Sequence, residues 1–217
     1  MLIVMSDLHL AESKSLGLGS VQFNHNLPAA VYREYFREIA ESLDDGFVPK
    51  IDLALAGDIF ELTRSALWLN TDLRPYWHLK DIAEGSPQEE MILTVLSAIA
   101  EDERVQETLE IIRGLEQTFQ RPTRVHFIPG NHDRLTNATP AVRSAVRRLL
   151  GMRDSPAAFE NQYLHPFDGQ PGALVRHGHE YDPNNFGENL RLKFVLPVRL
   201  PIEWYQSPAL GDITTPE

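Results

Sequence analysis

The stretch IDLALAGDIFE, residues 51–61, decides the fold of this chain. Its first part, IDLALA, is a short and largely apolar run, and Gly57-Asp58 then stops it. An apolar run of this length that ends at a turn signal is typical of a strand in a sheet covered on both faces. The sequence therefore predicts a buried strand over Ile51–Ala56 with a carboxylate, Asp58, directly after its carboxyl end.

Three further runs of this kind are spread along the chain, and segments with helical periodicity lie between them. The predicted strands are 2–5, 51–56, 124–128 and 173–176, and the predicted helices are 28–43, 86–119 and 139–150. SPQE at residues 86–89 resembles a capping box, and the charged residues 101–104 predict a break in the long helical segment. The alternation of strands and helices predicts an α/β domain.

Each predicted strand ends in polar side chains of the types that bind metals. They are Asp7 and His9, Asp58, Asn131 to Asp133, and His177. Taken singly, each has an ordinary structural explanation, such as a helix cap or a turn. Ligands of open α/β sheets gather at the carboxyl ends of the strands, so four such clusters favour one common site.

Composition narrows the class of protein. The chain has 217 residues, of which 42% are hydrophobic, and this is enough for one substantial core. It has no cysteine, which leaves oxygen and imidazole ligands and fits a reducing cytoplasm most easily. MLIVMSDLHL has no signal-peptide features, and no run approaches the roughly 18 apolar residues of a transmembrane helix. The net charge of -11 disfavours broad binding of nucleic acid without excluding a nuclease, because carboxylates that surround metals are counted without their ions.

Four motifs carry a family resemblance. SDLHL, GDIFE, GNHD and HG, in this order, resemble the calcineurin-like metallophosphoesterases, whose signature is D-x-H, G-D-x-x-[DE], G-N-H-[DE], H and G-H-x-H. The resemblance runs from Leu2 to about Asp182. It implies an αββα sandwich with mixed sheets and a dimetal centre at the strand carboxyl ends. The whole of 1–217 would be one such domain, with a helical insertion or cap over 60–123.

The resemblance also implies a role for each motif residue. Asp7 and His9 would bind the first metal, Asp58 would bridge both, and Asn131 and His177 would bind the second. Two divalent ions roughly 3.5 to 4 Å apart neutralise an anionic phosphoester and activate a water between them. This mixture of carboxylate, amide and imidazole suits Mn, or alternatively Fe or Zn.

Three residues beyond the metal ligands are candidates for catalysis or substrate binding. His132 would donate a proton to the departing ester oxygen, and Glu61 would hold its ring, although an exposed helix-start acid is an equally good interpretation of Glu61. Arg64 is a candidate phosphate clamp, with a surface arginine as the ordinary alternative. The aromatic residues at 68, 76 and 77 indicate either a substrate-selecting cap or simple packing.

The last motif presents a choice between two histidines. If residues 178–181 were G-H-x-H, Tyr181 would replace its second histidine, and His165 would have to serve as the fourth motif. His177 at the end of a predicted strand fits the fourth motif better and leaves the role of His179 open. The final G-H-x-H is then missing. A carboxyl-terminal part beyond residue 217, an omitted segment or a degenerate site would each explain this, and we favour the first, with the activity of the 217-residue chain left open.

The sequence thus predicts a dimetal phosphoester hydrolase in which a metal-bridging hydroxide attacks phosphorus. Its substrate would be a phosphomonoester, a phosphodiester or a pyrophosphate, and nucleic acid is allowed but not favoured. The alternative is a degenerate or truncated member that acts as a non-catalytic protein-interaction scaffold. In that case the segment 191–204, RLKFVLPVRLPIEW, would contact a partner protein or the absent carboxyl-terminal region.

Overall fold

The computed structural model describes residues 1–13, 17–18, 21–22, 25–43, 48–167, 170–188, 190 and 199–214. Within these residues the fold is mixed α/β, with six α-helices and a parallel three-stranded sheet. The α-helices are α1 (Ala29–Ser42), α2 (Pro87–Glu101), α3 (Glu103–Arg113), α4 (Leu115–Phe119), α5 (Pro140–Leu149) and α6 (Leu210–Thr214). Short 3₁₀ helices are η2 (Ala66–Asn70), η3 (Leu79–Asp81), η4 (Arg134–Asn137), η5 (His179–Tyr181) and η7 (Ile202–Tyr205).

The parallel sheet consists of β1 (Leu2–Met5), β4 (Ile51–Ala56) and β5 (Thr123–Ile128), in the order β1-β4-β5. Leu53 pairs with Ile3 on one side and with Val125 on the other. The two remaining strand pairs are antiparallel: β2 (Gly17–Leu18) with β3 (Val21–Gln22), and β6 (Tyr163–Phe167) with β7 (Gln170–Val175). The predicted strands 2–5, 51–56 and 124–128 are therefore confirmed.

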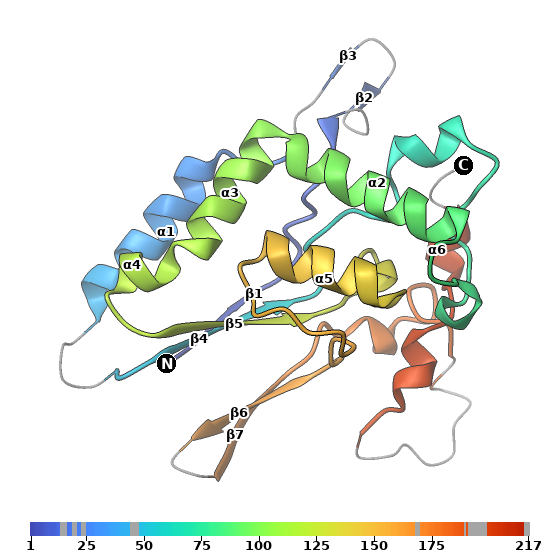
Figure 1. Cartoon of the computed structure of the whole chain (residues 1–217). Coiled ribbons are helices and arrows are strands. Elements are labelled where there is room, and N and C mark those ends of the chain that lie inside the picture. The colour runs from blue at the N-terminus through green and yellow to red at the C-terminus, as the bar shows by residue number, and fades with distance from the viewer. Residues whose placement is uncertain are drawn as a thin grey trace.

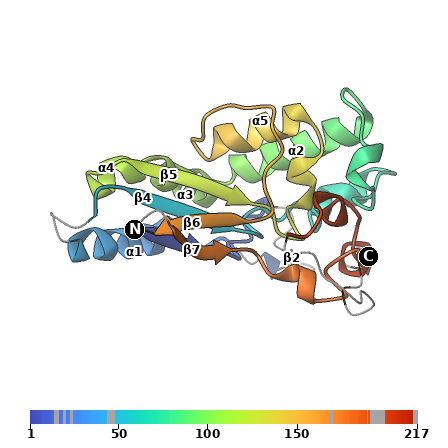
Figure 2. The same cartoon turned by 90° about the horizontal axis from the view of Figure 1, so that it is seen from below.

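The two faces of the sheet are covered by different layers. Helices α1 to α5 lie on one side of the sheet, and the β6-β7 hairpin lies on the other (Figures 1 and 2). All six residues of the central strand β4 are buried. Ala54, Ile128 and Val175 pack together on the hairpin side, where the Tyr163 ring also stacks on His126 at 3.8 Å. Burial on both faces explains why β4 lacks the alternating pattern of a half-exposed strand.

The helical segment from 60 to 123 packs into the main core. Its helices begin and break where the sequence predicts: the Ser86 hydroxyl accepts from the Glu89 N–H at 3.3 Å, and Asp102 caps α3. Trp68 is fully buried, and its indole N–H donates to the Leu62 carbonyl at 2.7 Å. This favours packing over substrate selection for Trp68. The buried residues of the segment share one cluster with those of β1, β4 and α1.

The predicted fourth strand has a different place from the other three. It begins at Gln170 rather than Ala173, and it pairs antiparallel with β6 instead of joining the parallel sheet. No pattern predicted β6, because Pro166 breaks its strand signal, and the pairing shifts register between His165 and Pro166 to accommodate it. None of the described helices has the length and apolar character needed to cross a membrane.

Candidate metal centre

The loops that follow β1 and β4 place the candidate ligands by unusual backbone conformations. Asp7, His9 and Asp58 have φ of 56°, 45° and 53°, a region that residues other than glycine rarely adopt. The Asp7 N–H donates to the Gly57 carbonyl at 3.0 Å, and the His9 N–H donates to the Asp58 carbonyl at 2.9 Å. These bonds join the two strand ends, so the surrounding structure holds the strain in place, as is common at functional sites.

One half of the site is compact. His177 Nε2 lies 3.2 Å from Asn131 Oδ1 and 3.2 Å from Asp58 Oδ2. Its Nδ1 lies 2.9 Å from the Ala56 carbonyl, which can only accept, so Nδ1 carries a proton, and Nε2 is directed at the two oxygens. Ligands bonded at about 2.0 to 2.2 Å to one ion lie roughly 3 Å apart, which matches this spacing.

The other half is wider and open to solvent. His9 Nε2 lies 3.9 Å from Asp7 Oδ1, and the Asp7 side chain is 57% exposed. One ligand atom each of Asp7, Asp58 and His177 lies within 4.8 Å of the others. Asp58 is therefore close to both His177 and Asp7.

Glu61 contacts two histidines at once. Its Oε1 lies 2.6 Å from His132 Nδ1, and its Oε2 lies 2.7 Å from His9 Nδ1. The side chain is only 11% exposed, so the alternative of an exposed helix-start acid is wrong. Burial opposes ionisation, but the two histidine bonds outweigh it and lower the pKa of Glu61, while the bond to Glu61 raises the pKa of His9. These are hydrogen-bond distances, so Glu61 orients both rings. The same three side chains are also close enough to one another to form a second candidate ligand group.

Burial and ion pairing also set the charges of the compact half. Burial opposes the charged forms of Asp58 and His177, but their mutual hydrogen bond and attraction outweigh it. The pKa of Asp58 is lowered and that of His177 is raised to about 9. In such a pair a metal cation can replace the proton between the imidazole nitrogen and the carboxylate.

The GNHD loop packs directly against Asp58. The His132 N–H donates to Asp58 Oδ1 at 2.9 Å, and His132 Nε2 lies 3.9 Å from Asp58 Oδ2. A side chain at Gly130 would come within 2.2 Å of Asp58 Oδ1, so the loop requires glycine there. The proposed proton donor is therefore fixed at the edge of the ligand set.

Asp133 holds the turn and lies away from the open side of the site. It is fully buried and accepts from the N–H groups of Gly130 at 2.5 Å, Ile59 at 2.8 Å and Phe60 at 3.4 Å. Burial and the Asp58 charge raise its pKa to about 7, against the effect of these donors. Its contacts link the ends of β4 and β5.

We expect Asp133→Asn to lower the free energy of unfolding by about 1–3 kcal/mol, because an amide nitrogen would face backbone donors and leave one unpaired. Urea unfolding measures this, with the exposed Asp72→Asn as the matched control. An Asp133→Asn chain as stable as the control would show that the carboxylate does not hold the turn.

The remaining candidates lie away from the ligand set. Arg64 is exposed in the turn after Glu61, and within the described residues it has no hydrogen bond or ion pair to a site residue. His165 Nδ1 lies 3.6 Å from Asp52 on the hairpin side, which excludes it as the fourth-motif ligand in this structure. The His179 side chain is buried against Tyr205, and its ring centroid lies 5.2 Å from that of His177. Burial lowers the pKa of His179 to about 3. Of the scaffold segment 191–204, residues 191–198 lie outside the described residues.

Arg134, directly after GNHD, was missed by sequence reasoning. It is buried and pairs with Asp212 at 3.2 Å, and its guanidinium also donates to the carbonyls of Pro75, Trp77 and Gln206. A basic residue beside a motif is the only signal in the sequence, and it does not reveal these partners. Arg134 joins the GNHD loop to two distant segments.

Comparison with known proteins does not assign the chain to a family. No family model matches the chain, and neither the curated proteins nor the solved structures contain a significant match. The assignment of function therefore depends on the motifs and on the distances between the side chains described above.

Proposed function

We propose that this protein is a metal-dependent phosphoester hydrolase of the calcineurin-like type. The observation that carries the proposal is the convergence of Asp58, Asn131 and His177 from three separate segments, with atoms at the spacing of ligands on one ion. Asp7 and His9 from a fourth segment stand on the open side of Asp58. If these residues only formed turns at the strand ends, their side chains would not have to meet at one point.

The donor set fits a pair of divalent ions. Imidazole, carboxylate and amide oxygen together suit Mn, or alternatively Fe or Zn. Asp58, Asn131 and His177 would hold one ion, and Asp7, His9 and Asp58 the other. When bound, the ions would supply charge neutralisation for the phosphoryl group and an acidified water.

His132 would act on the departing ester oxygen. Because the Glu61 carboxylate accepts from Nδ1, a protonated His132 carries its second proton on Nε2, beside Asp58. The contact with Glu61 fixes the orientation of this ring. Arg64 stays a predicted phosphate contact, since it is exposed and lies three residues after Glu61.

The two layers on the sheet support the αββα part of the proposal. The helices cover one face, and a second β layer, the β6-β7 hairpin, covers the other (Figure 2). His177 lies two residues after the end of β7, so this second layer would supply one ligand to the site at the strand ends of the first.

The proposal is tested with the full 217-residue chain and Mn²⁺. We expect Mn²⁺ to stabilise it, by about 2.7 kcal/mol at a concentration of roughly 100 Kd, and EDTA to reverse this. We expect Mn²⁺-dependent hydrolysis of bis-p-nitrophenyl phosphate or p-nitrophenyl phosphate. Asp58→Asn should abolish both effects, whereas the exposed Asp72→Asn should keep them. Stabilisation without hydrolysis of either ester would favour the non-catalytic scaffold. If Mn²⁺ produced neither stabilisation nor hydrolysis, the proposed metal site itself would be overturned.

A further inference from the structure

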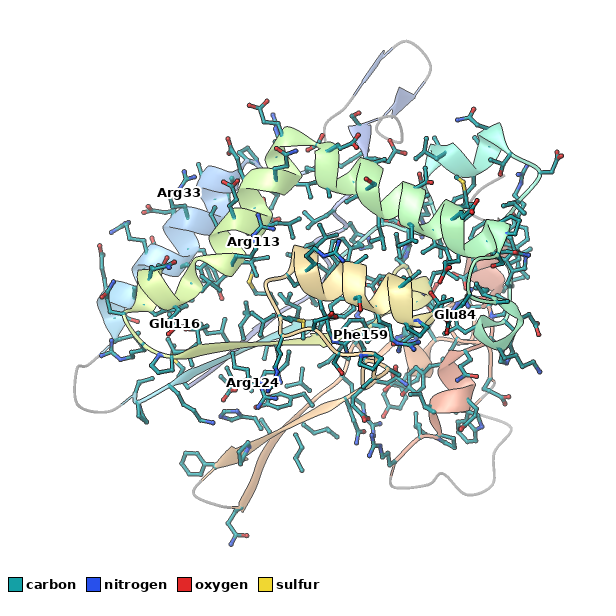
Figure 3. The ribbon with its side chains drawn as sticks, in the orientation of Figure 1. Arg33, Glu84, Arg113, Glu116, Arg124 and Phe159 are labelled. Atoms are coloured by element: carbon teal, nitrogen blue, oxygen red, sulfur yellow. The ribbon has the colours of Figure 1, made fainter. Side chains whose placement is uncertain are left out.

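A cavity of about 820 Å³ runs along the outer edge of β5, at a distance from the metal ligands. The end of α3, α4 and the loop 150–160 form its other walls. In Figure 3, Arg113 and Glu116 lie on the helical side of β5, and Arg124 extends on the hairpin side. The cavity therefore follows the strand rather than one face of the sheet.

The backbone of β5 is unpaired along this edge. β5 is the last strand in the order β1-β4-β5, and the Pro122 carbonyl accepts from the Ile51 N–H of β4 at 2.9 Å. Since successive residues of a strand point their backbone groups to opposite sides, Thr123, Val125 and Phe127 direct theirs outward. Within the described part of the chain these outward groups have no hydrogen-bond partner.

Cationic side chains slightly outnumber acidic ones around this edge. The lining includes four arginines, at 113, 124, 147 and 153, and three acids, at 116, 154 and 160. Glu160 pairs with Arg199, and Asp154, which accepts from the Ser144 hydroxyl at 2.8 Å, attracts Arg147. Three of the arginines then face Glu116 as the remaining acid of the lining. Arg124 and Arg153 are exposed, and neither has an ion-pair partner among the residues described. In a chain of net charge -11 this is a local reversal of sign.

We propose that this cavity is a docking site for an extended acidic peptide of a partner protein. The peptide would pair its backbone with the outer edge of β5 as an added strand. Its alternating side chains would lie on the two faces, with acidic residues toward Arg124 on one and toward Arg113 on the other, while Arg153 adds positive charge to the lining. A second copy of this chain is a poorer occupant, because pairing two β5 edges would bring the arginines of both copies together.

The probe is a fluorescein-labelled peptide of roughly eight residues with the repeat Glu-Glu-Val-Val, which presents Glu on both faces of an added strand and is long enough to cover the six residues of β5. Fluorescence anisotropy should show saturable binding that weakens with salt. A peptide with Lys in place of Glu, and one with Pro in place of Val, should not bind. Amide hydrogen exchange at Val125 and Phe127 should slow in the complex, because these N–H groups become paired.

Charge reversal supplies the decisive comparison. Arg124→Glu and Arg153→Glu should each lower the affinity for the peptide by about tenfold or more. The neutral Arg124→Gln should have an affinity between that of these two variants and that of the parent chain. Arg33→Glu, on the exposed surface of α1, is the matched control and should bind as the parent does. No binding at about 1 mM peptide would overturn the proposal. So would binding unchanged by Arg124→Glu, or sedimentation showing a dimer in which β5 is already protected.

Discussion

Replacing His132 with alanine should lower kcat for bis-p-nitrophenyl phosphate by roughly 10²- to 10⁴-fold, the usual contribution of a positioned general acid. The affinity for Mn²⁺ should stay within about twofold, because the His132 side chain is hydrogen-bonded to Glu61 and is not among the ligand atoms around Asp58 and His177. Steady-state kinetics at saturating Mn²⁺, with a parallel titration of Mn²⁺ binding, separate the two quantities.

Two further variants sharpen this result. Glu61→Gln should lower both kcat and Mn²⁺ affinity, because Glu61 contacts the rings of His9 and His132 together. His25→Ala, at an exposed position, should change neither and serves as the matched control. A His132→Ala enzyme with unchanged kcat would contradict the role of His132. If His132→Ala lowered kcat and the affinity for Mn²⁺ by the same factor, His132 would be reassigned to metal binding.

Replacing Arg134 with methionine should lower the free energy of unfolding by about 3–5 kcal/mol, the cost of leaving one member of a buried ion pair without its partner. Asp212 is 4% exposed, and among the described residues it would keep the Ala209 N–H as its donor. The carbonyls of Pro75, Trp77 and Gln206 would also lose a donor. Urea unfolding at neutral pH measures the change.

The double variant Arg134→Met/Asp212→Leu tests the cause. It removes the stranded charge, so it should recover at least about 1 kcal/mol relative to the single variant. Arg33→Met, on the exposed side of α1, should lie within about 0.5 kcal/mol of the parent chain. A single variant as stable as this control would show that the Arg134 contacts are replaceable.

The parts of the fold that local pattern determines could be predicted. β1, β4 and β5 are apolar runs with clear stops, and α1 and α5 have apolar residues at helical spacing. The hairpin could not be predicted, since β6 contains a proline and depends on the stacking of Tyr163 over His126, 37 residues away in the sequence (163 − 126 = 37). Pairing that depends on a distant surface leaves no local periodicity to read.

The candidate site divides in the same way. Residue type and position at a strand end were enough to bring Asp58, Asn131 and His177 together in the prediction. The contact of Glu61 with two histidines was not predictable. Glu61 and His9 are 52 positions apart in the sequence, and only the fold brings them together. The positive φ of Asp7, His9 and Asp58 likewise comes from bonds between two loops and not from residues that favour such angles.

The bond between His177 and the Ala56 carbonyl joins residues 121 positions apart, and this has a consequence for the order in which the site assembles. Closing a loop of this length costs chain entropy, so we expect the contact to form only after the intervening segments have folded. Asp58 and Asn131 meet His177 through the same closure. The three side chains that carry the proposed ion site are therefore expected to come together only when most of the chain is in place.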